Sequence, residues 1–213
     1  MADVLSRLGE AGLVPVIKLE DADKAVPLAE TLAEAGLPVA EVTFRTDAAE
    51  ASIRAMTKKV PSVLVGAGTV LTVDNAKAAL DAGASFVVTP GFNHKVVEFC
   101  LERGIPITPG INNPTGVESA LDLGITTVKF FPAEVSGGIA MIKALAAPYG
   151  MVRFIPTGGI SKDNLADYLK IPAILACGGS WIVPTKAIAE GDFSTVGALI
   201  TEAVGIVRES RKA

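Results

Sequence analysis

The feature that most constrains this sequence is a unit of one strand and one helix that repeats along its length. Each unit begins with a short apolar run, and an amphipathic stretch follows it. Eight such units occur at intervals of roughly 20 to 25 residues, after a short opening helix at residues 3–11. The predicted strands cover residues 13–18, 39–45, 63–70, 86–90, 105–109, 126–132, 152–157 and 173–177, and the predicted helices cover residues 21–35, 47–58, 73–82, 95–103, 114–123, 139–147, 162–169 and 195–211.

This alternation predicts an α/β protein whose parallel sheet closes on itself, a (β/α)₈ (TIM) barrel with a short N-terminal helix. We predict a single domain over residues 1–213, because neither a linker nor a change in composition interrupts the repeat. An open, doubly wound sheet is the alternative, since periodicity does not count strands reliably. In a barrel the catalytic residues come from the C-terminal ends of the strands, so polar residues there are the candidates for a site.

Composition limits the partners of such a barrel. The net charge of −4 and the lack of basic clusters argue against nucleic acid. No apolar run reaches the roughly 18 residues of a membrane span, and the first residues do not read as a signal peptide. Cys100 and Cys177 lie far apart among apolar or small residues, which indicates reduced thiols. We therefore expect a cytoplasmic protein with no nucleic-acid or membrane partner.

The predicted strand at residues 126–132 has a lysine at its centre. Because side chains alternate between the two faces of a strand, Lys129 points away from the face that carries Val128 and Phe130. If those two residues pack against helices, the amine points into the fold, where loss of hydration favours its neutral, nucleophilic form. A structural lysine whose amine reaches solvent at the strand end is the alternative.

Polar and apolar residues also alternate in the second predicted strand. Glu41, Thr43 and Arg45 share one face, and Val42 and Phe44 share the other. If the polar face lines the barrel, Glu41 can act as general acid and base, and Arg45 can anchor a carboxylate or a phosphate. The alternative is a Glu41–Arg45 pair that serves structure alone, because unpaired charges are costly in an interior.

Pairs of glycines follow the seventh and eighth predicted strands, at Gly158-Gly159 and Gly178-Gly179. In a barrel such turns can present backbone N–H groups to a phosphate, and Ser180 could add a hydroxyl, although ordinary tight turns are the alternative. Thr69 ends the third strand after the run Gly66-Ala67-Gly68, whose glycines could let a ligand or a neighbouring backbone approach closely. The only histidine, His94, has no neighbours in sequence that would complete a metal site. We predict a phosphate site and no metal.

Together, an interior lysine, a carboxylate, an anion-binding arginine and a phosphate cradle predict Schiff-base chemistry without a cofactor. The lysine would bond to the ketone of a phosphorylated keto compound, and the iminium would draw electrons while the adjacent C–C bond breaks. A base would take the proton of the hydroxyl on the departing aldehyde. The expected partner is therefore a small-molecule keto acid.

The sequence also closely resembles the bacterial 2-dehydro-3-deoxy-phosphogluconate (KDPG) aldolases, which include 4-hydroxy-2-oxoglutarate aldolases. The matching motifs are EVTFRT at 41–46, GAGTV at 66–70, Pro90-Gly91, KFFPAE at 129–134, PTGGI at 156–160 and GGSW at 178–181. These motifs follow one another over nearly the whole chain. Residue 89 is threonine where we expect serine in this family, a change that keeps the hydroxyl.

The resemblance implies a homotrimeric class I aldolase of the Entner–Doudoroff pathway that yields pyruvate and glyceraldehyde 3-phosphate, and that also cleaves 4-hydroxy-2-oxoglutarate. It implies Lys129 as the Schiff-base lysine and Glu41 as an acid and base that acts through water. The residues expected to bind substrate are Arg45, Thr69 and Phe131 around the keto acid, Gly158, Gly159 and Ser180 at the phosphate end, and in addition Pro90, Thr157 and Gly179.

Two other functions fit parts of the pattern. A sugar-phosphate epimerase or isomerase on the same barrel would use the lysine as an electrostatic group without a covalent bond, and such enzymes commonly need a metal. A ligand-binding or scaffolding barrel without turnover fits less well. Inward charges at Glu41, Arg45 and Lys129 would cost stability that a scaffold has no reason to give up.

Overall fold

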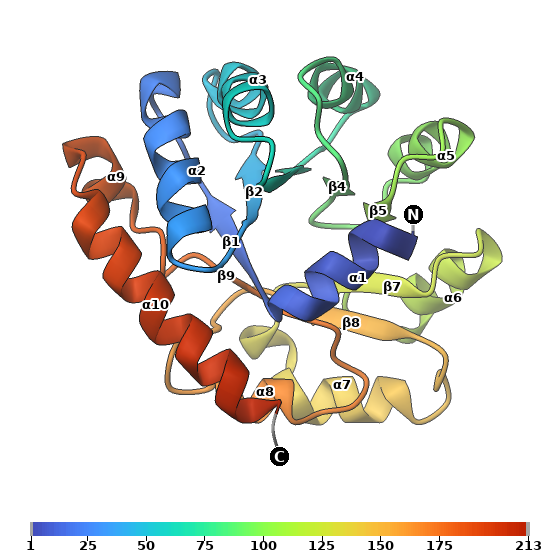
Figure 1. Ribbon diagram of the computed structural model, residues 1–213. Coiled ribbons are helices and arrows are strands. Elements are labelled where there is room, and N and C mark those ends of the chain that lie inside the picture. The colour runs from blue at the N-terminus through green and yellow to red at the C-terminus, as the bar shows by residue number, and fades with distance from the viewer. Residues whose placement is uncertain (1, 212–213) are drawn as a thin grey trace.

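The computed structural model describes residues 2–211, in which helices alternate with strands along the chain (Figure 1). The strands are β1 (Leu13–Ile17), β2 (Val39–Thr43), β3 (Leu64–Gly68), β4 (Val87–Val88), β5 (Ile107–Thr108), β6 (Gly110–Ile111), β7 (Thr127–Phe130), β8 (Arg153–Pro156) and β9 (Cys177–Gly179). The α-helices are α1 (Ala2–Ala11), α2 (Ala25–Glu34), α3 (Ala49–Lys59), α4 (Val73–Asp81), α5 (His94–Glu102), α6 (Pro114–Asp122), α7 (Gly138–Ala146), α8 (Leu165–Leu169), α9 (Thr185–Glu190) and α10 (Phe193–Ser210), with 3₁₀ helices η1 (Ala22–Lys24) and η2 (Glu134–Ser136).

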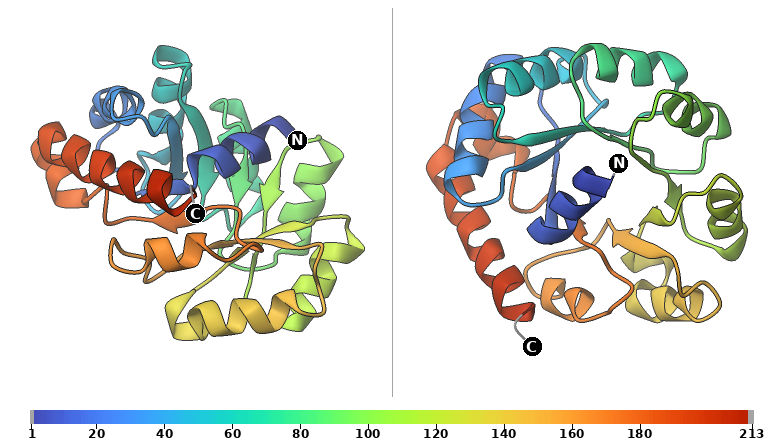
Figure 2. Two further views of the ribbon diagram at one scale, coloured as in Figure 1. Left: turned by 60° about the horizontal axis from the view of Figure 1, so that its bottom comes forward. Right: turned by 45° about the vertical axis from the view of Figure 1, so that its right-hand side comes forward.

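The strands pair in parallel and form a strongly curled sheet. One ladder has the order β5-β4-β3-β2-β1-β9, and a second has the order β6-β7-β8. The two ladders share the segment at residues 107–111, where Pro109 separates β5 from β6 because proline has no N–H to donate. Two single parallel bridges, Phe154 with Ile174 and Thr157 with Gly178, connect β8 to the segment that contains β9. The fold is therefore α/β with a curled parallel sheet, surrounded by helices (Figure 2).

Apolar residues fill two layers, one on each side of the curled sheet. Val128 and Phe130 of β7 are fully buried in the outer layer between the strands and the helices. The inner layer is a smaller cluster that includes Val14 and Phe86, together with Leu8 of α1. Because β1 begins directly after α1, this helix lies across the N-terminal ends of the strands (Figure 2). Within residues 2–211, no helix is long and apolar enough to cross a membrane.

The observed elements match the predicted order, but several boundaries differ. The predicted strand at 173–177 is shifted to Cys177–Gly179, because the ladder with β1 begins where Leu13 pairs with Cys177. The apolar run before it makes only one bridge to β8. The predicted closing helix at 195–211 begins earlier, at Phe193, because the carboxylate of Asp192 caps it by accepting from the Thr195 N–H at 3.0 Å. Helix α9 was not predicted.

Candidate functional site

Lys129 and Glu41 lie inside the curled sheet and contact each other. Lys129 is 5% exposed and Glu41 is 3% exposed. The amine Nζ of Lys129 donates to Oε1 of Glu41 at 3.2 Å. The prediction that Lys129 points into the interior is confirmed, and the alternative of a lysine that reaches solvent is wrong. The amine is held away from bulk water with one carboxylate beside it.

Small residues in neighbouring strands make room for this pair. Gly68 of β3 faces the Glu41 side chain, and a Cβ atom there would come within 2.3 Å of Oε1. Gly110 of β6 pairs in register with Lys129. A side chain at Gly68 would occupy the space of the Glu41 carboxylate, and one at Gly110 would collide with the backbone of Pro90. The glycines in the GAGT run do allow close approach, but the approaching groups are side chains, Glu41 at Gly68 and Phe86 at Gly66, and not the ligand or backbone that was predicted.

The space around the pair is small and has one polar and one apolar side. Its polar lining comes from Glu41, Lys129, Thr108 and Thr157, and its apolar lining comes from Leu8, Val14, Phe86, Val88 and Ile155. The free volume is about 10 Å³, at the lower limit of the roughly 10–15 Å³ that one water needs. Since Leu8 belongs to α1, that helix helps to keep water away from the pair on the side of the strand N-termini.

Phe131 and Pro90 line a second, larger hollow at the C-terminal ends of β4 and β7. Its volume is about 330 Å³, and Gly110 and Pro132 also line it. The Lys129 amine lies 5.4 Å from the centre of the Phe131 ring, within the range of a cation–π contact. The predicted residues Phe131 and Pro90 therefore lie together, on the side of the lysine where a substrate could enter.

Thr89 shapes this hollow and was missed as a functional candidate. Its buried hydroxyl donates to the carbonyl of Gly91 at 2.7 Å and accepts from the N–H of Gly110 at 3.3 Å. The Gly110 backbone lies so close to Pro90 that a Cβ atom would come within 2.3 Å of it. One hydroxyl thus fixes the Pro90 turn against the strand beside Lys129. The signal in the sequence was a hydroxyl residue placed directly before the proline.

The prediction that Arg45 points inward together with Glu41 and Thr43 is wrong. Strand β2 ends at Thr43, and the Arg45 N–H donates back to the Thr43 carbonyl at 2.8 Å, so the alternation stops. Arg45 is exposed and lines an outer hollow with Phe44 and Asp47. Thr43 is buried as predicted, and its hydroxyl donates to the Ile17 carbonyl at 2.8 Å. The predicted Glu41–Arg45 pair does not form, since Glu41 pairs with Lys129.

The predicted phosphate-binding turns have the backbone geometry that glycine allows. Gly158 and Gly159 have φ values of +98° and +85°. Gly179 is covered by the ring of Trp181, which a Cβ atom would approach to 1.9 Å. Ser180 is exposed, next to this turn. Thr69, the remaining predicted residue at a strand end, also has a positive φ of 54° without being a glycine, which is a strained conformation.

Thr157 links the glycine turns to the interior pair. Its side chain lines the same small space as Lys129, and its backbone forms a parallel β-bridge with Gly178. Among the described residues, its buried hydroxyl oxygen is one of two buried side-chain atoms without a hydrogen-bond partner. A buried polar group without a partner is costly, so this hydroxyl is available to a ligand.

Glu134 and Tyr168 support the Gly158-Gly159 turn from outside. The buried Tyr168 hydroxyl donates to Oε1 of Glu134, and burial, followed by this hydrogen bond, raises the pKa of Tyr168. The stem of Glu134 covers Gly159, where a Cβ atom would come within 2.4 Å of Cγ. The Glu134 N–H also donates to the Gly158 carbonyl at 3.0 Å. The turn is therefore held in place before any ligand arrives.

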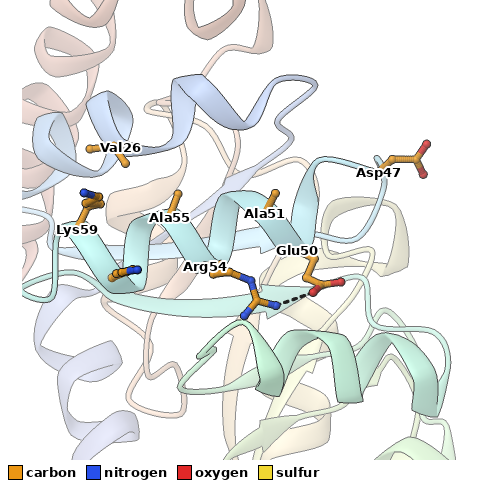
Figure 3. Close-up of a pocket in the computed structure, with 8 residues that line it drawn as sticks. Val26, Asp47, Glu50, Ala51, Arg54, Ala55 and Lys59 are labelled. Carbon is orange, nitrogen blue, oxygen red and sulfur yellow. Dashed lines mark hydrogen bonds and ion pairs between the residues drawn. The ribbon is translucent and has the colours of Figure 1, made fainter.

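A larger hollow lies on the outside of the molecule, remote from these residues. It has a volume of about 480 Å³ between α2 and α3 (Figure 3). Val26, Ala51 and Ala55 line it, and Arg54 donates to Glu50 at 2.6 Å along its edge. None of the predicted site residues line it, so the volume of a hollow does not by itself identify the catalytic site of this protein.

Comparison with known proteins identifies the family. The family model described as KDPG and KHG aldolase matches residues 4–199. A 2-dehydro-3-deoxy-phosphogluconate aldolase of Treponema pallidum is 53% identical over 207 residues, which cover 97% of this chain and 99% of the relative.

Two solved structures are also similar over almost the whole chain. The 2-keto-3-deoxy-6-phosphogluconate aldolase of Zymomonas mobilis, solved with 3-phosphoglycerate, is 41% identical with a TM-score of 0.90, and 96% of each chain is covered. The KDPG aldolase of Legionella pneumophila, solved with pyruvate captured as a covalent carbinolamine, is 36% identical with a TM-score of 0.91, covering 94% of this chain and 97% of the other. This chain belongs to the KDPG and KHG aldolase family.

Proposed function

We propose that the protein is a class I aldolase that cleaves 2-dehydro-3-deoxy-6-phosphogluconate to pyruvate and glyceraldehyde 3-phosphate. It also cleaves 4-hydroxy-2-oxoglutarate to pyruvate and glyoxylate. The observation that carries the proposal is the buried amine of Lys129, 3.2 Å from the carboxylate of Glu41. Family membership supports this proposal, and so does the covalent pyruvate carbinolamine captured in the Legionella relative, since a carbinolamine forms when an amine adds to a ketone.

The reaction follows from what these two groups can do. Lys129 first gives a proton to Glu41, its ion-pair partner, and the amine that results adds to C2 of the keto acid. Loss of water from the carbinolamine then gives an iminium. Glu41, acting through a water that enters with the substrate, moves the protons of these steps and takes the C4 hydroxyl proton. The C3–C4 electron pair flows into the iminium, so the aldehyde leaves and an enamine remains. Protonation at C3 and hydrolysis then release pyruvate and return the amine.

Substrate binding is assigned to the residues around this pair. Arg45, Thr69, Pro90 and Phe131 hold the keto acid, and Thr157, Gly158, Gly159, Gly179 and Ser180 hold the phosphate end. The shared hollow of Pro90 and Phe131 supports the keto-acid side, and the positive φ values of Gly158 and Gly159 support a turn that presents its backbone to the phosphate. Arg45 is exposed, so its role requires the side chain to turn toward the bound carboxylate.

We further propose that the curled sheet is a closed (β/α)₈ barrel and that residues 1–213 form a single domain. The two bridges between β8 and the β9 segment support closure. We propose a homotrimer that works in the cytoplasm without a cofactor, as the family resemblance implies. Light scattering on the purified protein would give three times the chain mass, and a monomer would contradict this assembly.

Borohydride trapping tests the central proposal. Reduction in the presence of pyruvate should add the mass of the reduced adduct to a peptide that contains Lys129, and K129M should abolish both the adduct and turnover. An active enzyme with an unmodified Lys129 would refute the Schiff base. E41Q should keep the adduct and lose most turnover, since it removes the proton carrier while keeping the amine. Full turnover in E41Q would remove Glu41 from the mechanism. K143Q, which removes a lysine from helix α7, is the control.

A further inference from the structure

Lys18 follows the last residue of β1, and its position directs it toward the opening of the curled sheet. Ile17 and Leu19 on either side are buried in the outer apolar layer between strands and helices. Side chains alternate along an extended segment, so Lys18 lies on the opposite face, the one that carries Val14 into the interior. The Thr43 hydroxyl, which donates to the Ile17 carbonyl, helps to fix this segment.

This position is next to the turn that is assigned to the phosphate. β1 lies between β2 and β9 (Figure 1), and Pro15 pairs with Gly179 in register. The ladder ends at this pair, and Ser180 follows Gly179 directly. Lys18, three residues after Pro15, therefore lies at the C-terminal edge of the sheet, where the Gly179-Ser180 turn also begins.

None of the residues assigned above to the substrate phosphate carries a positive charge. Gly158, Gly159, Gly179 and Ser180 are neutral donors, whereas a phosphate monoester carries about −1.5 to −2 charges at neutral pH. Glu134, whose stem covers Gly159, adds negative charge there. Hydrogen bonds from a charged donor are roughly twice as strong as neutral ones, so a cation here would contribute substantially to binding.

Lys18 forms a weak ion pair with Glu20, and a phosphate can replace the Glu20 carboxylate. Its amine lies 2.5 Å from Oε1 of Glu20, and the two side chains are 34% and 55% exposed. An ion pair this exposed contributes little stability, because water screens it and both side chains lose freedom. A phosphate offers more charge than the Glu20 carboxylate, so exchange of partners is favourable.

We propose that Lys18 is the charged anchor for the substrate phosphate and that it exchanges Glu20 for the phosphate when substrate binds. This inference rests on the aldolase function proposed above. It makes Lys18 a determinant of specificity between the two substrates. In 4-hydroxy-2-oxoglutarate the second carboxylate is attached directly to the hydroxyl-bearing carbon, so it does not extend as far as the phosphate of the six-carbon substrate.

Steady-state kinetics of K18Q on both substrates test the proposal. K18Q should raise KM for the phosphorylated substrate about tenfold, the loss expected for one charged hydrogen bond, and raise the Ki of inorganic phosphate. KM for 4-hydroxy-2-oxoglutarate should not change. K18R should restore phosphate selectivity, and E20Q should lower KM for the phosphorylated substrate. K170Q, which removes the more exposed surface pair of Lys170 with Asp167, is the control for loss of one lysine charge and should leave both values unchanged.

The outcomes separate this inference from the proposed function. An unchanged KM for the phosphorylated substrate in K18Q, or an equal rise for both substrates, would overturn the role of Lys18. Pyruvate trapping at Lys129 in the same preparation shows whether the aldolase chemistry holds. If wild type and K18Q both trap pyruvate while K18Q keeps its phosphate selectivity, only the Lys18 inference fails.

Discussion

At the scale of single residues, the site depends on groups that are buried with few partners. Lys129 has Glu41 as its carboxylate partner, and the Thr157 hydroxyl has no partner among the described residues. Such arrangements cost stability in the free protein and are found where a ligand completes them. Because the ion pair is almost fully buried, removing the charge of one member leaves the other without compensation, which typically costs about 3–5 kcal/mol. E41Q therefore needs a check of folding beside its kinetics.

Thr89 gives a prediction at this scale. T89V keeps the shape of the side chain but removes the hydroxyl that joins Gly91 to Gly110. We expect it to lower stability by about 1–3 kcal/mol, because the buried Gly110 N–H loses its partner, and to raise KM for both keto acids. T89S should restore both values. Urea unfolding and steady-state kinetics measure the two effects.

A control separates lost positioning from lost stability. The Thr31 hydroxyl donates to the Pro27 carbonyl within α2, away from the site. T31V should leave KM unchanged, whatever its effect on stability. A wild-type KM in T89V would show that the Pro90 turn does not depend on the hydroxyl.

At the scale of elements, the ends of strands and helices decide where side chains point. β2 ends at Thr43, which removes Arg45 from the face that Glu41 occupies. α10 begins at Phe193 because Asp192 supplies a cap, and α1 places Leu8 beneath the ion pair. In each case a local hydrogen bond, or the short link between two elements, sets the position of a side chain that the alternation of polar and apolar residues does not predict. Element boundaries therefore carry functional information that periodicity does not give.

The cap of α10 predicts a pH dependence. Hydrogen bonds from the Thr195 hydroxyl, then from its N–H, and from Ser194 hold the pKa of Asp192 below its ordinary value of 3.8. A carboxyl whose pKa is lowered on folding contributes stability above its unfolded value and loses it as pH falls through the folded value. D192A should therefore unfold at a lower temperature than wild type at pH 7, and the difference should shrink below about pH 4.

Thermal unfolding at several pH values measures this effect. D192N keeps a capping oxygen without a charge, so its deficit at pH 7 should be smaller than that of D192A. A deficit of D192A that stays constant down to pH 3 would contradict the assignment of the stabilisation to the charged cap.

At the scale of the whole molecule, the curl of the sheet brings the residues of the site together. Glu41 and Lys129 are 88 residues apart in sequence, and they meet because β2 and β7 face each other across the curled sheet. β8 and the β9 segment are connected by isolated bridges instead of a continuous ladder. The glycine turns that are assigned to the phosphate lie on either side of this connection.

Hydrogen exchange tests the closure. The Leu175 N–H donates to the Phe154 carbonyl at 2.9 Å, and the Phe154 N–H donates to the Ala173 carbonyl at 2.8 Å. If the sheet is closed, these amides should be protected as strongly as the Leu64 N–H between β2 and β3, because all of them open only with the whole sheet. Amide exchange measured by NMR gives the comparison. Exchange at the rate of an exposed loop would show that the sheet is open here.

The sequence by itself determined the order of the elements and the inward direction of Lys129. Both follow from local periodicity, because the backbone of a strand alternates its side chains whatever the rest of the chain does. The same rule placed Glu41 and Thr43 correctly and failed for Arg45, where the strand had already ended. The family motifs added the expected roles of these residues, which periodicity could not provide.

Only the tertiary structure decided which groups meet. The contact of Lys129 with Glu41, the close fit of Gly68 against Glu41, and the cover that α1 gives the pair all depend on the curvature of the sheet. Curvature is a property of all the strands together, so no local pattern in the sequence reports it. The physical reason is the distance along the chain: alternation acts between adjacent residues, whereas the curl of the sheet brings together side chains that are far apart in the sequence.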